Sequence, residues 1–443
     1  MGKSDRRAAS LRTPAGGNTH FFAQRFINIV GVGYALIVGE LLVCVRRRDR
    51  PDYGEKCLSQ AFLLDRTAFM NRILLVNLEG RTAGAEKSLL LLVKHLKSDF
   101  VLTAACPTDS SLSDALREMG IDCYVLPAPP RRYRSLWSLA YWLRTAWRIG
   151  RIALNAKADI IHANSFKAAA ASCPAALLTG RKLIMHARDL SRRGFLFRFC
   201  TRHCAKIIAV SRAVKDNLAE QGTQADKVEV VYNGVDDSSA ETVASDNTTP
   251  GSQHGDNDEF IFAQVGQLAP WKNHTLFLKA AACVAEALPD ARFLLIGDDL
   301  FGRDSTYRTS LLAQIKDSGI PERVTLTGWQ QNMQRVWPRI GCLVHTAEAE
   351  PFGRVIIEAM AHKVPVIAAD AGGPREIING AKTGILVAAG DIEALTEAML
   401  HMARHRESAQ ELAEAGYRHV ASNFTADKTA AQIGEIYEEV LAR

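Results

Sequence analysis

From residue 70 onward, short apolar runs alternate with stretches in which apolar residues recur at helical spacing. Residues 73–76 and 101–105 are apolar runs bounded by polar residues, and the segment 86–96 between them has helical periodicity. Apolar strands that alternate with amphipathic helices are typical of βαβ units and a parallel sheet. The pattern predicts further strands at 123–126, 159–162, 182–186, 207–210 and 228–231, and helices at 111–119, 135–156, 167–178 and 211–221.

The segment 236–258 interrupts this pattern, because it is rich in Ser, Thr, Asp, Asn and Gly and has no periodic apolar face. Such a composition is typical of a flexible linker. The strand and helix alternation then resumes, so the predicted fold class is α/β, with two Rossmann-like domains facing each other across a ligand cleft. The predicted divisions are an N-terminal extension at 1–69, a first domain at 70–236, a linker at 237–258, a second domain at 259–422 and a C-terminal helix at 423–443 that packs back on the first domain.

The length and composition support two globular domains. The chain has 443 residues, and single domains cluster near ~100–200. Its apolar fraction of 47% and charged fraction of 23% exclude a disordered, collagen-like or coiled-coil chain. The net charge of +6 is unevenly distributed: residues 1–69 carry +5, residues 70–236 carry +11 and residues 237–443 carry −10. The basic first part favours an anionic partner, either a membrane surface or a nucleic acid.

The first 69 residues contain a candidate membrane segment. Residues 26–45 are apolar except for Asn28 and Glu40, and three arginines follow them. Twenty such residues are long enough to span a bilayer. Two interpretations stay open: 1–69 is a basic membrane anchor, or it is a dispensable extension and the functional chain begins at Met70. A signal peptide fits poorly, because no small-residue cleavage site follows.

The nine cysteines form no regular framework. Cys200 and Cys204 flank His203, but a zinc site needs about four ligands and no second pair has suitable spacing. Reduced thiols in a cytosolic enzyme are the favoured interpretation, and no metal site is predicted.

The strongest chemical signal is a pair of glutamates eight residues apart, Glu350 and Glu358. The segment between them passes from a loop containing Pro351 and Gly353 into a helix near Val355. The first backbone N–H groups of a helix carry partial positive charge and suit a phosphate, and a glycine permits close approach. We expect Glu350 to lie near a sugar and Glu358 to accept hydrogen bonds from ribose. The alternative is a solvated helix start whose acids complement the helix dipole.

This segment resembles the E-x7-E motif of the retaining group 1 glycosyltransferases of family 4, which have the GT-B fold. Other segments agree with that family in order and spacing, and the resemblance covers about residues 70–443. These segments are VGQLAPWKN at 265–273, AGGPRE at 371–376, TGILV at 383–387, VYNGVD at 231–236 and AVS at 209–211. A glycine-rich segment at 80–86 also resembles the first loop of the family.

The resemblance implies roles for individual residues. Lys272 matches the lysine that binds the donor diphosphate and stabilises the leaving group. Gln267 stands where the family usually has arginine, which removes one cation, and Arg354 is a candidate substitute. The expected catalytic residues are His186, Glu350 and Lys272. The expected donor-binding residues are Gly84, Gln267, Lys272, Gly328, Phe352, Gly353, Arg354, Val355 and Glu358. The expected acceptor-side residues are His162, Asn164, Arg188 and Asp189.

Alternatives stay open at two of these strand ends. His186 is either near the reacting sugar or a structural histidine of the loop. His162 and Asn164 end another strand and are expected to face the cleft. The Ser165 that follows them is a candidate either for ligand binding or for capping the next helix.

The basic first domain carries aromatic residues among its arginines. Three of the six tryptophans lie within 137–147, and a second basic run with Phe195 and Phe197 covers 188–202. One interpretation is that the tryptophans pack on the sheet and the arginines are solvated. The other is docking on an anionic membrane surface, which gives access to a lipid-linked acceptor. No nucleic-acid motif accompanies the pattern, so no nucleic acid is expected as a partner.

Together, these features predict a retaining glycosyltransferase. It is expected to move a sugar from a nucleotide-sugar donor, without a metal or other cofactor, to a glycan or lipid-linked acceptor in cell-surface polysaccharide or lipopolysaccharide synthesis. The expected location is the cytoplasm, on the inner face of the cell membrane. The alternatives are a non-catalytic nucleotide-sugar-binding partner, which Gln267 favours, and a sugar-nucleotide epimerase or phosphorylase of the same fold.

Overall fold

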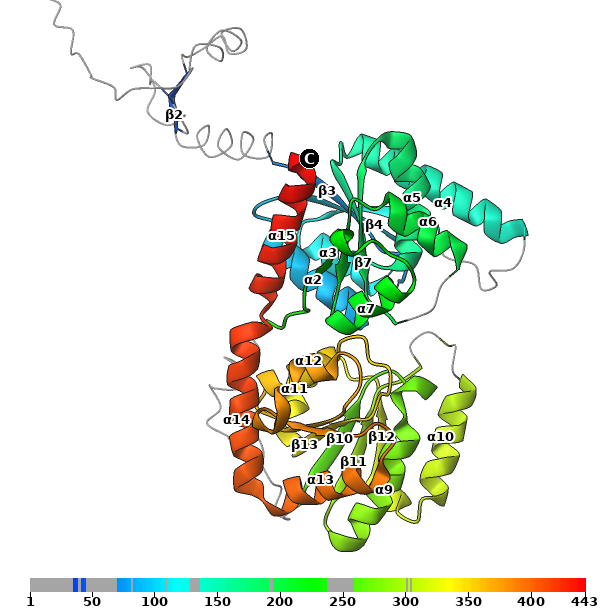
Figure 1. Cartoon of the computed structure of the whole chain (residues 1–443), viewed down its shortest axis with the longest axis vertical. Helices are drawn as coiled ribbons and strands as arrows, with labels where there is room; N and C mark the ends of the chain where they lie inside the picture. Colours follow the sequence, from blue (N-terminus) through cyan, green and yellow to red (C-terminus); the bar gives the residue numbers. More distant parts are fainter. Residues whose placement is uncertain are drawn as a thin grey trace, which may run out of the picture. The chain divides into compact units, whose positions relative to one another are not determined.

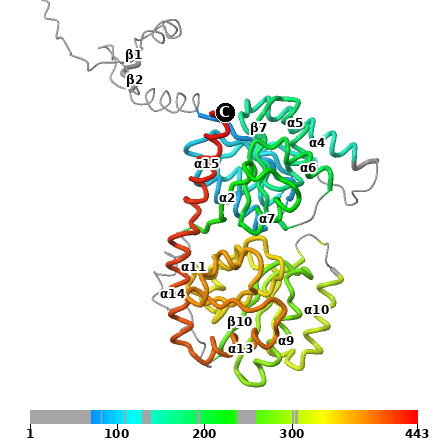
Figure 2. Tube along the Cα trace, in the orientation of Figure 1, coloured from blue at the N-terminus to red at the C-terminus, as the bar shows by residue number. Residues whose placement is uncertain are grey.

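The chain divides into two units, Met1–Phe69 and Met70–Arg443 (Figures 1 and 2). The structure, a computed structural model, describes residues 35–38, 41–44, 70–80, 83–107, 110–127, 136–190, 194–236, 259–299, 302 and 305–443. In the first unit these are two antiparallel strands, β1 (Ala35–Val38) and β2 (Leu41–Cys44). They fall within the candidate membrane segment 26–45, whose other residues lie outside the described part. Across the described residues, no helix combines the length and apolar character needed to cross a bilayer.

The first domain of the large unit is built on a seven-stranded parallel sheet of order β5-β4-β3-β6-β7-β8-β9. Its interior strands are almost continuously apolar and buried, as a sheet covered on both faces requires. The order reverses between β3 and β6, and such a reversal opens a crevice for ligands at the carboxyl ends of the strands. The strands are β3 (Arg72–Val76), β4 (Val101–Pro107), β5 (Asp122–Leu126), β6 (Ile160–Ala163), β7 (Lys182–Ala187), β8 (Lys206–Ala209) and β9 (Val228–Val230).

Helices cover both faces of this sheet (Figure 1). One core cluster joins the strands to α2 (Gly84–Leu96), α3 (Ser111–Glu118) and α15 (Ala426–Ala442). A separate cluster joins them to α4 (Leu136–Asn155), α5 (Phe166–Thr179), α6 (Phe195–His203) and α7 (Arg212–Glu220). The basic run at 188–202 thus contains a helix, α6, that the sequence analysis did not predict.

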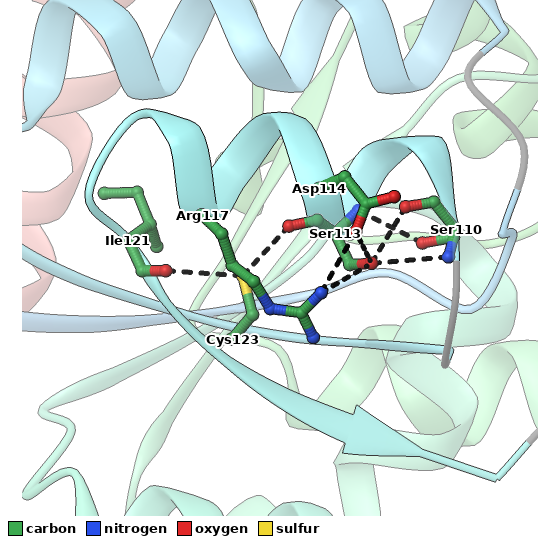
Figure 3. A network of polar contacts seen from close by, with 6 residues as sticks. All are labelled: Ser110, Ser113, Asp114, Arg117, Ile121 and Cys123. Carbon is green, nitrogen blue, oxygen red and sulfur yellow. Dashed lines mark hydrogen bonds and ion pairs between the residues drawn. The ribbon is translucent and has the colours of Figure 1, made fainter.

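Short polar side chains fix where the helices begin. Ser165 and Ser211 cap α5 and α7 by accepting hydrogen bonds from the third amide of each helix, which settles the open question about Ser165 in favour of capping. Figure 3 shows the start of α3, where Ser110 Oγ accepts from the Ser113 amide at 3.1 Å. In the same network, Cys123 Sγ at the start of β5 lies 3.8 Å from the Ser113 carbonyl, which ties α3 to β5.

The second domain repeats the architecture with a six-stranded parallel sheet of order β12-β11-β10-β13-β14-β15. Its strands are β10 (Ile261–Val265), β11 (Arg292–Ile296), β12 (Val324–Gly328), β13 (Cys342–His345), β14 (Val366–Ala369) and β15 (Ile385–Val387). Its helices are α9 (His274–Ala287), α10 (Ser305–Asp317), α11 (Arg354–Ala361), α12 (Pro374–Ile377), α13 (Ile392–Arg404) and α14 (Arg406–Asn423). Short 3₁₀ turns complete the connections in both domains, at Ala225–Lys227, Pro270–Lys272, Pro321–Arg323, Met333–Arg335, Trp337–Arg339 and Gly380–Lys382.

The last two helices join the domains. Helix α14 packs on α11 of the second domain, and α15 returns to pack beside α2 of the first, as Figures 1 and 2 show. Tyr437 on α15 is fully buried, with its ring against Phe100 and its hydroxyl 2.6 Å from His162 Nδ1. The C-terminal helix therefore completes the core of the first domain.

Buried neutral histidines predict a loss of stability in acid. Burial lowers the pKa of His162 and of His274 to about 3, whereas an unfolded histidine titrates near 6.5. The unfolded chain therefore takes up protons that the folded chain refuses. The contribution of these histidines to the free energy of unfolding is complete above pH 6.5. It decreases as the pH drops below 6.5, by up to about 1.4 kcal/mol per pH unit for each histidine. Urea unfolding at pH 7.5, 6.5 and 5.5 measures this.

A matched pair of variants identifies the source of this pH dependence. His162→Gln removes one buried titratable group and is expected to make the free energy of unfolding less dependent on pH below 6.5. His401→Gln changes an exposed histidine and is expected to leave this dependence unchanged. Equal slopes in both variants and in the wild-type chain would contradict the assignment to His162.

Candidate functional site

A cavity of about 350 Å³ lies between the two domains, at the carboxyl ends of strands from both sheets. From the first domain it is lined by the start of α2 and by residues that follow β7. From the second it is lined by the loops after β10, β11 and β13 and the start of α11. The predicted site residues that line it are Gly84, Arg188, Asp189, Gln267, Lys272, Glu350, Phe352, Gly353, Arg354, Val355 and Glu358.

The central feature of the cavity wall is an ion pair. Lys272 Nζ donates to Glu350 Oε2 at 2.5 Å, and His345 Nε2 lies 3.1 Å from the same oxygen. Burial by itself raises the pKa of Glu350, but the Lys272 ammonium and the His345 hydrogen bond outweigh it and hold this pKa well below its usual range. Burial also lowers the pKa of His345, so a neutral imidazole donates through Nε2. Glu350 is therefore a fixed, ionised acceptor at the cavity.

Lys272 is itself held in place by its neighbours. Its ammonium lies over the Trp271 ring, 4.2 Å from the centroid, which is a cation–π contact. A Cβ at Gly266 would lie 3.4 Å from Lys272 Cε, so the absence of a side chain at Gly266 leaves room for the Lys272 side chain. Among the described residues, Glu350 uses one of the three ammonium N–H bonds, which leaves two that a ligand can use.

The loop that carries Glu350 leads directly into α11. Gly353, the residue before the helix, has φ +100°, a conformation that side chains with a Cβ rarely adopt. The first amides of α11 have no partner within the helix, and the helix begins at the cavity. This end of α11 therefore offers donors and partial positive charge to an anionic group.

A glycine pair supports this loop from behind. A Cβ at Gly372, where φ is +61°, would lie 2.4 Å from the Glu350 carbonyl oxygen. A Cβ at Gly373 would lie 2.3 Å from Phe352 Cα, and the Gly373 amide donates to the Glu350 carbonyl at 2.9 Å. Two backbones thus meet at van der Waals distance, which is the physical reason for glycine at both positions.

Arg354 brings a second cation to the same wall. One nitrogen, Nη2, donates to Glu358 Oε1 at 2.9 Å. Its Nε and Nη1 are buried and have no hydrogen-bond partner among the described residues. Gly84, at the start of α2 in the first domain, lies beside it. Arg354 therefore keeps two nitrogen donors for a ligand on this wall. Gln267 lines the same cavity and stands where the resembling family usually has an arginine.

Arg188 supplies positive charge from the first domain. Its guanidinium donates to Asn164 Oδ1 at 3.1 Å and Asn233 Oδ1 at 3.0 Å, and it lies 3.1 Å from His186 Nδ1. Burial lowers the pKa of Arg188 to about 9, so it stays protonated at neutral pH. Three neutral acceptors thus fix a cation that lines the cavity.

Four predicted site residues do not line the cavity. His186 is buried behind Arg188, and burial lowers its pKa well below the usual range, so it is a neutral acceptor there. His162 lies beneath Tyr437 of α15, and Asn164 is enclosed by Asn77 and Arg188. Gly328 ends β12, where its carbonyl accepts from the Gly297 amide. The expectation that His162 and Asn164 face the cleft differs from their observed burial, because α15 and Arg188 cover the end of β6.

Several residues that line the cavity were not predicted. Lys87 and Trp329 meet across the two domains, with the ammonium 5.5 Å from the ring centroid. Asn233 holds Arg188, and His345, which does not line the cavity, holds Glu350. Trp329 directly follows Gly328, an expected donor-binding residue, and of the two it is Trp329 that lines the cavity.

The candidate metal ligands are spread over the described part of the chain. No group of three or more His, Cys, Asp or Glu side chains there is placed to hold a metal ion. Cys200 lies within α6 and Cys204 follows its last residue, and both are buried.

Comparisons with known proteins find related sequences over both domains. Residues 82–239 match the family profile described as Glycosyltransferase Family 4, and residues 247–419 match the one described as Glycosyl transferases group 1. The chain is 25% identical over 313 residues to the N-acetyl-alpha-D-glucosaminyl L-malate synthase of Bacillus anthracis, covering 68% of this chain and 80% of the relative. It is 23% identical over 331 residues to the UDP-Gal:alpha-D-GlcNAc-diphosphoundecaprenol alpha-1,3-galactosyltransferase of Escherichia coli, with the same two coverages.

A solved structure matches the fold over most of the chain. The crystal structure of Anabaena HepE in complex with UDP and glucose superimposes with a TM-score of 0.70 and 25% identity. The match covers 83% of this chain and 99% of the Anabaena chain. The predicted α/β fold of two Rossmann-like domains facing across a cleft is thereby confirmed.

The glycine pair behind the Glu350 loop yields a stability prediction. Gly373→Ala places a Cβ against the Phe352 backbone, so the loop must shift, and the free energy of unfolding is expected to fall by about 1–3 kcal/mol. Gly194→Ala is the control, because its added Cβ meets no atom within 4 Å. Urea unfolding of both variants measures the difference. Equal stability of the two would show that the loop tolerates the added methyl group.

Proposed function

The chain belongs to the group 1 glycosyltransferases, and we propose that it transfers a sugar from a nucleotide-sugar donor to a glycan or lipid-linked acceptor with retention of configuration. The observation that carries this proposal is the Lys272–Glu350 pair beside the start of α11 in the interdomain cavity. The Escherichia coli relative is named for an acceptor built on a lipid diphosphate. Synthesis of cell-surface polysaccharide or lipopolysaccharide is the proposed role.

The donor is proposed to bind along the second domain. Its diphosphate lies against the first amides of α11, with Lys272 and the unpartnered nitrogens of Arg354 as counter-charges. The ionised Glu350 accepts from hydroxyls of the sugar, and Glu358 accepts from the ribose. The Anabaena protein binds UDP and glucose, so a UDP-sugar is the first donor to test.

The proposed chemical step places negative charge where the cations are. The bond between the anomeric carbon and the diphosphate oxygen breaks, and its electron pair stays on the diphosphate. The acceptor hydroxyl oxygen bonds to the same face of that carbon, and its proton passes to the departing phosphate. Lys272, Arg354 and the α11 amides stabilise the developing charge without a metal ion. Arg188 and Asp189 line the side from which the acceptor enters.

We propose His186 as a support of this step rather than a partner of the sugar hydroxyls. Its Nδ1 accepts from Arg188, which itself lines the cavity. It thereby keeps the guanidinium aimed along one wall of the site.

We also propose an anionic membrane surface as the place of action. Helices α4, α5 and α6 expose most of the large apolar side chains that the structure shows at the surface, and Trp142 instead packs on the core. Arginines stand among them, and Arg151 lies over the exposed Trp147 ring, 5.1 Å from its centroid. Apolar and basic groups on one face fit a bilayer with anionic headgroups. The exposed apolar residues are Leu139, Leu143, Trp147, Leu154, Leu177, Leu178, Phe195, Leu196 and Phe199.

Replacement of the donor lysine tests the transfer reaction. Lys272→Met keeps an unbranched side chain, one atom shorter, but removes the charge, and nucleotide release from UDP-sugars with membrane extract is expected to fall at least about a hundredfold. Lys279→Met, on the exposed face of α9, is the control and keeps full activity. Transfer by the wild-type chain is expected to persist in EDTA, since the protein's own cations serve the diphosphate.

Two outcomes would contradict the proposal. Unchanged nucleotide release by Lys272→Met would remove this residue from the reaction. Stabilisation of the wild-type chain by UDP, worth about 2.7 kcal/mol at 100 times its dissociation constant, without any nucleotide release would favour a non-catalytic binding partner.

Vesicle binding tests the membrane surface. The double variant Trp147→Ser with Phe195→Ser is expected to bind phosphatidylglycerol vesicles at least about tenfold more weakly than the wild-type chain. Leu312→Ser, an equally apolar exposed position on α10 of the second domain, is expected to bind like wild type. Binding to phosphatidylcholine vesicles is expected to be weak in all three. Equal binding of both variants and the wild-type chain would rule out this face.

A further inference from the structure

One carboxylate of the second domain reaches into the first. Glu376 lies on α12, outside the donor cavity, and its Oε2 accepts from the Arg212 amide at 2.8 Å. Its Oε1 accepts from the Ala213 amide at 2.9 Å. These are the first two amides of α7, which have no partner within their own helix. A carboxylate at this end also complements the helix dipole, so the contact joins the domains by charge as well as by hydrogen bonds.

The same end of α7 holds the loop that carries Glu350. Ser211, which caps α7, donates its hydroxyl to the Pro351 carbonyl at 2.6 Å. Tyr232 donates to Glu376 Oε2 at 3.0 Å, and its ring stacks on Phe352 with the centroids 6.0 Å apart. Ser211 and Tyr232 of the first domain thus contact this loop directly, and Glu376 of the second domain contacts Tyr232 and the start of α7.

The loop is held from two sides. The Gly372–Gly373 turn lies directly behind it in the second domain, and Glu376 follows that turn after two residues. The first domain closes the other side through Ser211 and Tyr232. The first domain therefore adds two contacts to the loop that carries Glu350, one at Pro351 and one at Phe352.

We propose that Glu376, with Ser211 and Tyr232, forms an interdomain latch that fixes the Glu350 loop only when the two domains are closed. Glu376 contacts neither donor nor acceptor, so it is a positioning residue. Its carboxylate is partly exposed, which lets its hydrogen bonds exchange for water when the domains part. Donor binding to the second domain alone precedes the latch, and transfer follows it. Only the kinetic consequence rests on the proposed transferase function.

Amide hydrogen exchange tests the latch without any activity. In the wild-type chain, the Arg212 and Ala213 amides are protected by Glu376, and added UDP is expected to slow their exchange further by favouring closure. Glu376→Gln leaves at most one acceptor oxygen for two amides and a hydroxyl, so exchange at these amides is expected to rise at least about tenfold. Glu411→Gln, an exposed acid on α14, is the control and changes nothing.

Kinetics test what the latch does for the reaction. Glu376→Gln is expected to lower kcat about tenfold or more, while the Kd for UDP changes less than about threefold. Glu376→Asp keeps the charge and is expected to recover part of kcat, and Tyr232→Phe is expected to show a smaller loss than Glu376→Gln.

Two results would overturn the inference: wild-type exchange rates at residues 212 and 213 in Glu376→Gln, or an unchanged kcat despite faster exchange. Absence of transfer in the wild-type chain would count against the proposed function, and the exchange data would still decide whether the latch exists.

Discussion

The site depends on a buried ion pair between Lys272 and Glu350. Breaking such a pair by removing one partner costs roughly 3–5 kcal/mol, because the other charge is left in a medium that cannot solvate it. Each side chain therefore fixes the other, and His345 adds a neutral hydrogen bond that keeps the carboxylate ionised. The pair presents an acceptor and a cation side by side at the cavity. A donor that carries both hydroxyls and a diphosphate matches that arrangement.

The first domain also holds a buried cation at the cavity, but with neutral hydrogen-bond acceptors as its partners. Arg188 is a buried cation, and it is held by Asn164, Asn233 and His186 rather than by a carboxylate. Neutral acceptors leave its charge available to the cavity. The two domains thus bring cations to one cavity from opposite walls, and the contacts of Glu376 with α7 tie the walls together. The contacts that hold the two domains together therefore also set the positions of the cations around the cavity.

Much of this organisation was predictable from local pattern. The apolar runs and helical periodicities predicted both sheets and most of the helices, because those signals come from neighbours in sequence. Two helices were missed: α6, whose mixture of phenylalanine and arginine resembles a surface loop as much as a helix, and the short α12, which lies in the AGGPRE motif. The segment 350–358 was also open to prediction, since a helix start is a local feature, and Lys272 was expected from the resemblance to the glycosyltransferase family. Their mutual distances were not.

The sequence by itself determined the α/β class, and through its motifs it directed attention to Lys272 and Glu350. Only the tertiary structure decided which side chains meet. It enclosed His162 beneath Tyr437, a residue 275 positions later in the chain, and placed His186 behind Arg188. It also turned Glu376 from part of a turn motif into a contact between domains. Periodicity reports which face of an element is buried, whereas these contacts depend on how distant elements pack, and that information is absent from any local stretch of sequence.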